Sequence, residues 1–261
     1  MTPLIDTHCH IDVRFLPDGA DAIIERAKAA GIVGMIAIGV GDDMESARSA
    51  MSLAQRYPLM IRAAVGVHPH EAAKFDDTMF AELKVLADDE SVVAIGETGL
   101  DYHYEFSPRD LQRAAFVKQI ALARKLKKPI VVHTRNAAAD TLEILKSEGA
   151  SDVGGVIHCF SEDIAFATEA LKMNFDISFS GLVTFDKAKS IQETAAWVPA
   201  DRILIETDAP FLAPVPLRGK KCEPAFLVHT AKRIAELRGV TFEEIAKITS
   251  ANARRRFGLK F

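Results

Sequence analysis

Short apolar runs recur along the chain, each followed by a longer segment in which apolar residues have helical spacing. The runs are rich in Val and Ile, are bounded by Gly, Pro or Asp, and are too short for helices, so they predict β-strands. They start about 20–40 residues apart, the length of a strand, a loop and a crossover helix. The eight predicted strands are Leu4–His8, Gly34–Val40, Met60–Val65, Val92–Glu97, Pro129–His133, Gly154–His158, Phe175–Phe179 and Ile203–Asp208.

The intervening segments carry helix signals. Ser107–Asp110 offers a capping serine, a proline at the first helical position and an acid in the first turn. One apolar stripe then continues that helix: Leu111, Ala115, Leu122 and Leu126. Thr241–Glu244 is a capping box ahead of another helix, with Ile245 and Ile248 facing inward. Arg254–Arg256 suits the C-terminal end of that helix and predicts a structural role there.

Continuous Val/Ile strands that alternate with amphipathic helices predict an α/β protein with a parallel sheet covered by helices. Eight such units favour closure into a TIM, or (β/α)8, barrel. A doubly wound open sheet is the alternative, but no Gly-rich phosphate fingerprint follows the first run. No linker, low-complexity tract or charge block divides the sequence, so we expect residues 1–261 to form a single domain.

Residues capable of chemistry follow the predicted strands at one end. In a barrel the C-terminal ends of all strands meet at one mouth, where barrel enzymes place their active sites. Glu97 and Asp208 end two of the strands. Six of the eight histidines are expected at the same mouth: His8, His10, His68, His70, His133 and His158.

The spacing of the first two histidines fits a metal site. Because side chains alternate along a strand, His8 and His10 point to one side and Cys9 to the other. Two imidazoles on one side can bind one divalent cation. For an isolated His-x-His, two ordinary polar residues in a turn are the more frequent explanation. The matching placement of the other candidates favours metal binding here.

The remaining candidates extend the site beyond one ion. His133 and His158 end neighbouring strands, and either one alone would be interpreted as a core histidine. Glu97 and Asp208 follow apolar runs, where an unpaired buried carboxylate would cost several kcal/mol. A metal ion offsets that cost, and an ion pair with Arg135 is the alternative. Four histidines and two carboxylates exceed one tetrahedral site and suit two metals about 3.5–4 Å apart that share a carboxylate.

The roles of three further features can each be interpreted in more than one way. Glu206 points inward one layer deeper, where it would support other groups rather than bind metal. Arg135 either binds a substrate phosphate as a bidentate fork or forms a surface salt bridge. Residues 213–221 follow the last strand and include Arg218 and two lysines. Loops at that place commonly bind phosphate in barrels, and a solubilising loop is an equal alternative.

Composition narrows the class of protein. With 49% hydrophobic and 26% charged residues the chain is globular, not disordered, collagen-like or coiled coil. A net charge of −4 excludes a protein that binds nucleic acid over a large basic surface, but not an enzyme that binds phosphates only at its active site. The longest apolar run, Gly31–Gly41, is too short for a membrane span, and no signal peptide is visible. Three cysteines without a CxxC spacing predict a reducing, cytoplasmic setting, with Cys9 and Cys159 as small buried residues.

Several segments at these strand ends and in the last loop occur together: Thr7–Asp12, Gly66–His70, Gly96–Asp101, His158–Ser161, Glu206–Pro210, and Arg218–Lys220 through Glu223–Pro224. In combination they resemble the TatD family of metal-dependent hydrolases, and the resemblance runs through the whole chain in order. It implies a barrel of the amidohydrolase superfamily and a DNase with 3′-to-5′ exonuclease or phosphodiesterase activity. It also implies two divalent metal ions, with Mg, Mn, Zn, Ni and Co all possible.

The resemblance assigns roles by position. It places His68 in the substrate pocket near the scissile phosphate. The implied metal ligands are His8, His10 and Asp208 for one ion, His133 and His158 for the other, and Glu97 as the bridge.

We therefore expect hydrolysis of a phosphodiester at a nucleic-acid end, with single-stranded DNA as the preferred substrate. Asp208 would orient and deprotonate water at the metals that Glu97 bridges, and His68, Arg135 and Arg218 would bind the substrate. One alternative is a metal-dependent hydrolase of another ester, such as D-aminoacyl-tRNA, or of a small ester or amide. The other is a barrel that stores metal or binds a partner without catalysis. The sequence indicates no obligate protein partner.

Overall fold

The computed structural model describes residues 2–11, 19–41 and 44–261. Its strands are β1 Leu4–Cys9, β2 Ile32–Gly39, β3 Ile61–Val65, β4 Val92–Asp101, β5 Ile130–Arg135, β6 Gly155–Ile157, β7 Phe175–Phe179 and β8 Ile203–Ile205. Its α-helices are α1 Gly19–Ala29, α2 Glu45–Arg56, α3 Asp77–Asp88, α4 Arg109–Leu126, α5 Ala138–Ser147, α6 Ile164–Lys172, α7 Lys189–Trp197, α8 Leu227–Arg238 and α9 Phe242–Phe257. Within the described ranges, no helix combines the length and apolar character needed to cross a membrane.

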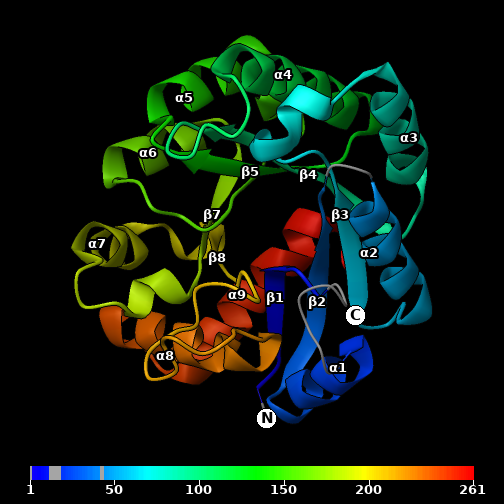
Figure 1. The fold of residues 1–261 in the computed structure, drawn as a ribbon. Helices are drawn as coiled ribbons and strands as arrows, with labels where there is room; N and C mark the ends of the chain where they lie inside the picture. The colour runs from blue at the N-terminus through cyan, green and yellow to red at the C-terminus, as the bar shows by residue number, and fades with distance from the viewer. Residues whose placement is uncertain (1, 12–18, 42–43) are drawn as a thin grey trace.

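The eight strands form one parallel sheet in chain order, from β1 to β8. The first and last strands meet just beyond their ends, where Cys9 forms a β-bridge with Ala209. There the backbone N–H of His10 donates to the carbonyl of Ala209 at 2.7 Å, and that of Asp208 donates to the carbonyl of His8 at 2.9 Å. Figure 1 shows the strands at the centre of a ring of helices. The predicted TIM barrel is confirmed, and the open sheet is excluded.

Strand ends differ from the predicted ones where the chemistry begins. Strand β4 runs to Asp101, four residues past its predicted end at Glu97. Strands β6 and β8 are shorter than predicted, so His158 and Asp208 lie in the segments that follow them. The backbone turns sharply at Asp208, which has a left-handed conformation with φ 56°. Asp208 thus lies beyond the end of β8, next to the bridge between Cys9 and Ala209.

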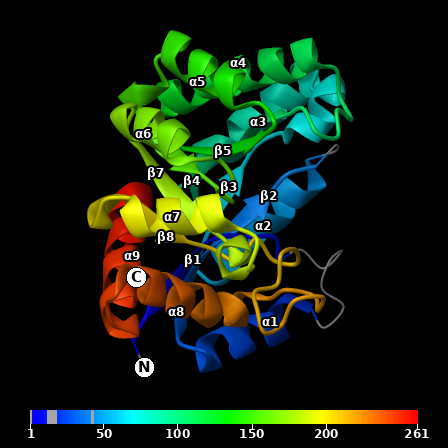
Figure 2. The same cartoon turned by 90° about the vertical axis from the view of Figure 1, so that its left-hand side faces the viewer.

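The apolar core has two parts. The larger part lies between the strands and the surrounding helices. The smaller part fills the barrel away from the mouth, where inward side chains such as Ile5, Ile36 and Leu204 pack against Phe257 of α9. Figure 2 shows α9 at the end of the barrel opposite the long loop that follows β8. The histidines and acids of the candidate site lie at the other end, at the mouth.

Helix α4 differs from its predicted pattern. Leu111 is 39% exposed, whereas Gln112 and Gln119 are fully buried against the barrel. The spacing of apolar residues could not reveal this, because the two amides are buried through hydrogen bonds to backbone groups of the site. Ser107 does not cap α4, because its hydroxyl donates to the carbonyl of His70 at 2.7 Å.

Helix α9 begins with the predicted capping box, in which the side chains of Thr241 and Glu244 each bond to the other's backbone N–H. Arg255 and Arg256 in its last turn contact Asp176 of β7, an acid that is buried. One Asp176 oxygen accepts from Arg256 Nε at 2.7 Å, and the other accepts from Arg202 Nε at 2.5 Å. The predicted structural role of these arginines agrees with this contact.

Replacing Asp176 with Asn should lower the free energy of unfolding by about 2–4 kcal/mol, because it leaves buried guanidinium groups without their counter-charge. Urea denaturation followed by circular dichroism measures the change. Asp152→Asn is the matched control, since its ion pair with Arg124 is exposed and should contribute less than about 1 kcal/mol. Equal losses in the two variants would contradict this account.

Candidate metal centre

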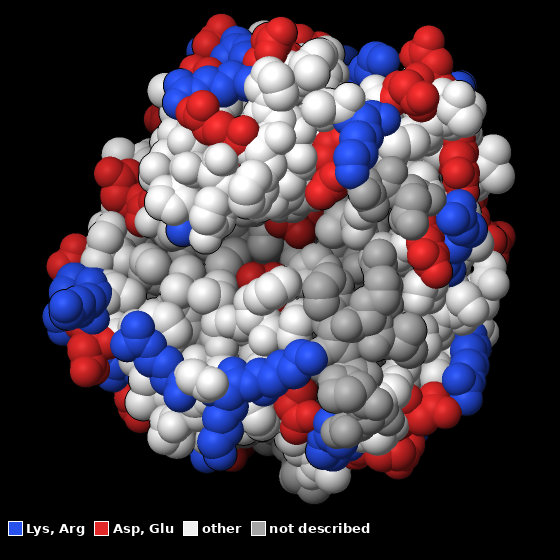
Figure 3. All heavy atoms as spheres, in the orientation of Figure 1, with Lys and Arg blue, Asp and Glu red and all other residues white. Residues whose placement is uncertain are grey.

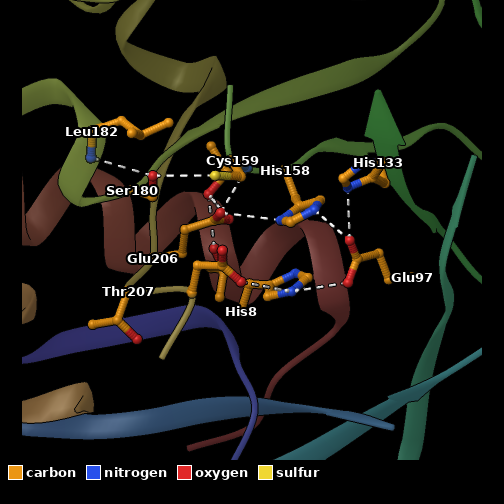
Figure 4. A network of polar contacts seen from close by, with 12 residues as sticks. His8, Glu97, His133, His158, Cys159, Ser180, Leu182, Glu206 and Thr207 are labelled. Atoms are coloured by element: carbon orange, nitrogen blue, oxygen red, sulfur yellow. Dashed lines mark hydrogen bonds and ion pairs between the residues drawn. The ribbon is translucent and has the colours of Figure 1, made fainter. Parts of the chain in front are cut away.

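Glu97 lies at the centre of the mouth, and its two carboxylate oxygens face different groups of histidines. Its Oε1 is 2.8 Å from His158 Nε2 and 3.0 Å from His133 Nδ1. Its Oε2 is 3.4 Å from His8 Nε2 and 3.8 Å from His10 Nε2. Figure 4 shows the carboxylate facing the rings of His8, His133 and His158. The side chain is only 5% exposed, so these contacts replace its hydration.

The first donor group consists of His8, His10, Asp208 and the Oε2 atom of Glu97. The Nε2 atoms of His8 and His10 are 3.3 Å apart, and each is 3.6 Å from Asp208 Oδ1. Cys9 points to the opposite side, where its thiol donates to the carbonyl of Ile36 at 3.5 Å. This alternation is the one expected from the sequence. Asp12, the last residue of the segment resembling the family, lies outside the described residues.

The second donor group consists of His133, His158 and the Oε1 atom of Glu97, with His68 at its edge. His68 Nε2 is 3.3 Å from Glu97 Oε1. The backbone N–H of His70 donates to His68 Nδ1 at 3.2 Å, which leaves the ring proton on Nε2. In that tautomer His68 faces the centre as a hydrogen-bond donor, and it could bind metal through Nε2 only after losing that proton.

The electrostatics of the mouth keep both carboxylates ionised. Burial would raise the pKa of Glu97, but the charge of His158 and the hydrogen bonds from His133 and His158 hold that pKa well below its usual value. Burial likewise opposes ionisation of Asp208, and the hydrogen bond from His10 and the charges nearby lower its pKa. Ionised carboxylates are the form that binds metal.

Glu206 lies behind His158, as expected for a residue one layer deeper. Its Oε1 is 3.2 Å from His158 Nδ1 and accepts the backbone N–H of Cys159 at 2.6 Å. Its Oε2 accepts from the hydroxyl of Ser178 at 2.5 Å. Burial would lower the pKa of His158, but Glu97 and Glu206 on its two nitrogens raise it well above the ordinary value. These contacts set the plane of the His158 ring.

Asp101 is a site residue that the sequence pattern did not single out. Its Oδ2 is 2.9 Å from His70 Nε2 and 3.1 Å from His133 Nε2. Buried Gln112 of α4 accepts the Asp101 N–H at 2.8 Å and donates to its carbonyl at 3.1 Å. Asp101 therefore holds His133 from the side away from Glu97. The available signal was its position four residues after Glu97 on the same strand.

Two local features bring β4 close enough to deliver these groups. Gly99 has φ 141°, and a Cβ there would lie 2.0 Å from the carbonyl oxygen of His133, so only glycine fits beside β5. On the other side of the strand, buried Gln119 donates to Thr98 Oγ1 at 2.7 Å and to the carbonyl of Val67 at 3.0 Å. Helix α4 thus fixes β4 and the end of β3 together.

A cavity of about 670 Å³ opens above the two donor groups. Figure 3 shows the hollow with acidic atoms on its floor and a row of Lys and Arg side chains below it. Arg135 lines this cavity, and so does Cys159, which is half-buried rather than part of the core as predicted. Arg218 is not among the described residues that line it. The Arg218 guanidinium lies 4.5 Å from the ring centroid of Phe185, at a neighbouring cavity of about 400 Å³.

The residues at the mouth fit divalent metal. Among the described residues, three sets of side chains lie close enough to hold an ion: His8 with His10 and Glu97, His68 with Glu97 and His133, and His8 with His158 and Glu206. The first two sets share Glu97. Imidazole nitrogen with ionised carboxylate oxygen is a donor set typical of Zn, Mn, Ni or Co. Within the described chain, the buried Nδ1 of His8 has no hydrogen-bond partner, so protein hydrogen bonds alone do not satisfy this ring. A parallel barrel with these donors at its C-terminal mouth defines the class of metal-dependent barrel hydrolases.

Comparison with known proteins agrees with this class. The family model described as TatD related DNase matches residues 5–258. The uncharacterized metal-dependent hydrolase YabD of Bacillus subtilis (strain 168) is 46% identical over 254 residues, covering 97% of this chain and 98% of that protein. The 3′-5′ ssDNA/RNA exonuclease TatD of Rahnella sp. is 36% identical over 242 residues, covering 91% of each. The crystal structure of YJJV, a TatD homolog from Escherichia coli K12, aligns with a TM-score of 0.90 at 27% identity over 98% of both chains. The chain belongs to the TatD family of metal-dependent hydrolases.

Glu97→Gln should weaken metal binding at least 100-fold, a larger loss than the roughly 10–100-fold typical of residues that only support ligands. The charge that both donor groups share is removed, while the shape of the side chain is kept. Elemental analysis after dialysis at fixed free metal measures the effect. Glu71→Gln is the control, because Glu71 lines the same cavity but pairs with Lys74. A variant that keeps the wild-type metal content would contradict the assignment of Glu97.

Asp101→Asn should weaken metal binding about 10-fold or more, because the neutral amide no longer fixes the ring of His133. Competition with a chromogenic chelator gives the affinity. Glu71→Gln again serves as the control. If the metal affinity stays at the wild-type value while thermal stability falls, Asp101 does not support metal binding and only stabilises the loop that follows β4.

Proposed function

We propose that this protein is a divalent-metal-dependent phosphodiesterase that removes nucleotides from the 3′ ends of single-stranded nucleic acid, using two ions in the two donor groups. The observation that carries the proposal is the shared carboxylate, because one oxygen of Glu97 faces each group. The relative named as a 3′-5′ ssDNA/RNA exonuclease supports the choice of substrate. Divalent cations held there supply an activated water and neutralise charge on the phosphoryl oxygens.

Asp208 is the proposed general base. Its side chain is 13% exposed toward the cavity, while its Oδ1 faces His8 and His10. The same contacts keep Asp208 ionised, so a carboxylate oxygen is free to accept the proton of the attacking water. The backbone at this residue is left-handed, and the side chain lines the cavity.

His68 is proposed to bind the phosphate. Burial lowers the pKa of His68 to about 4, although Glu97 opposes this shift, so the ring is neutral near pH 7. Its Nδ1 accepts the N–H of His70, and Nε2 therefore carries the proton toward the cavity. A neutral N–H donor at this place can stabilise a phosphoryl oxygen as negative charge develops there.

The shape of the mouth favours a chain end. A cavity of about 670 Å³ accommodates one nucleotide. The donor groups lie at its floor, so a phosphate in a continuous duplex cannot reach them without fraying. The net charge of −4 predicts weak binding to nucleic acid away from the mouth.

Chelation should abolish hydrolysis of bis-p-nitrophenyl phosphate, and added Mn²⁺ should restore it. Asp208→Asn should lower kcat about 10²- to 10⁴-fold through loss of the general base, with an unchanged circular dichroism spectrum. Asp77→Asn is the control, since that side chain is 99% exposed on α3.

The same assay separates the alternative reactions. Cleavage of a carboxylester panel, including an aminoacyl ester, without cleavage of any phosphodiester would overturn the nuclease proposal. Full activity of Asp208→Asn would overturn its role as base.

A further inference from the structure

The loop between β4 and α4 exposes aromatic rings beside the cavity. Tyr104 is 50% exposed and Phe106 is 67% exposed. Large rings in a surface loop lose hydrophobic stabilisation unless something covers them, so their exposure next to a binding cavity indicates a contact surface.

The rings are held in a defined arrangement. Tyr104 and Phe106 are stacked, with centroids 5.3 Å apart and an interplanar angle of 3°. The guanidinium carbon of Arg135 lies 4.7 Å from the Tyr104 centroid. His70 meets both rings edge-on, with centroids 5.7 Å from Tyr104 and 4.8 Å from Phe106. We refer to Tyr104, Phe106 and Arg135 as the platform.

The loop backbone is fixed in advance of any ligand. Asp101 Oδ1 accepts the backbone N–H groups of His103 and Tyr104, both at 3.0 Å. Ser107 ties the far end of the loop to the carbonyl of His70 at 2.7 Å. A preorganised surface loses little conformational entropy on binding, so its contacts contribute more to affinity.

The platform adjoins the second donor group. Asp101 Oδ2 contacts both His70, which packs on the platform, and His133, which faces Glu97. Tyr104 and Arg135 line the same cavity as Glu97 and His133. A planar group on the platform is therefore next to the position where a phosphodiester would react.

We propose that the platform stacks a nucleobase of the nucleotide next to the scissile phosphodiester, an inference that rests on the proposed function and specifies its substrate. Aromatic rings with a guanidinium attract the π-face of any base, and such stacking tolerates different base sequences. In this proposal Arg135 contacts the base together with Tyr104, whereas the sequence left a substrate phosphate and a surface salt bridge open for it. Substrates without a base, such as small esters, gain nothing from this surface.

The test compares two phosphorothioate-linked pentamers that hydrolyse slowly, one of thymidine and one with abasic tetrahydrofuran sugars. Binding to the Mn²⁺-loaded full chain is measured by fluorescence anisotropy. Because the backbones are identical, the ratio of the two Kd values reports the base alone. The wild type should bind the thymidine pentamer on the order of tenfold more tightly.

Tyr104→Leu/Phe106→Leu should abolish this preference, because leucine keeps apolar volume without a stacking face. Tyr104→Phe should retain the preference. Trp197→Leu is the matched control and should also retain it, since this ring is 44% exposed at the end of α7 that leads into β8, away from the mouth. Thermal midpoints and metal content show that each variant is folded and loaded.

Equal affinity of the wild type for both pentamers, or a preference that survives in the double leucine variant, overturns the platform. Failure of the proposed function has a different signature, namely no cleavage of methyl p-nitrophenyl phosphate, a diester without a base. If the wild type cleaves this diester but binds both pentamers equally, the platform proposal fails and the proposed phosphodiesterase function stands.

Discussion

The rest of the site depends on one buried carboxylate whose negative charge must be compensated. The Glu97 side chain is 5% exposed, and its oxygens lie 2.8–3.4 Å from the nearest imidazole nitrogens on either side. Positive charge is required on both sides, and protonated histidine or metal can supply it. Because each oxygen serves a different group, the proposed ions would be coupled through this residue, and loss of Glu97 would affect both. Asp101 and Glu206 then restrict the histidines that face it.

The barrel and the clustering at its mouth follow from simple patterns. Apolar runs of strand length at regular intervals predicted eight parallel strands, and the structure contains them in chain order. Because the C-terminal ends of such strands converge, residues as distant in sequence as His8 and Asp208 could be expected to meet. The structure brings them within 3.6 Å of each other. Only the pattern of each strand and the closure of the sheet are needed for that expectation.

Alternation of side chains could not predict what lies beyond these ends. The ladder between β4 and β5 has a register shift between Ile95 and Thr98, so Glu97 faces inward although strict alternation from Ala94 would turn it outward. Asp101 was overlooked because the strand continues past the residue at which apolar character ends. Gln119 is a polar residue that is buried in the fold, because its amide forms hydrogen bonds with the backbone N–H and carbonyl of Val67, which is distant in sequence. Such contacts depend on tertiary packing and leave no periodic signal.

The central claim is that Glu97 joins two metal ions into one centre. Electron paramagnetic resonance of the Mn²⁺-loaded protein tests it directly, because two Mn²⁺ ions that share a carboxylate are exchange-coupled. We predict a coupled spectrum from the wild type and its replacement by the signal of isolated ions in Glu97→Gln. A wild-type protein that shows only uncoupled Mn²⁺ at saturating metal would contradict the account.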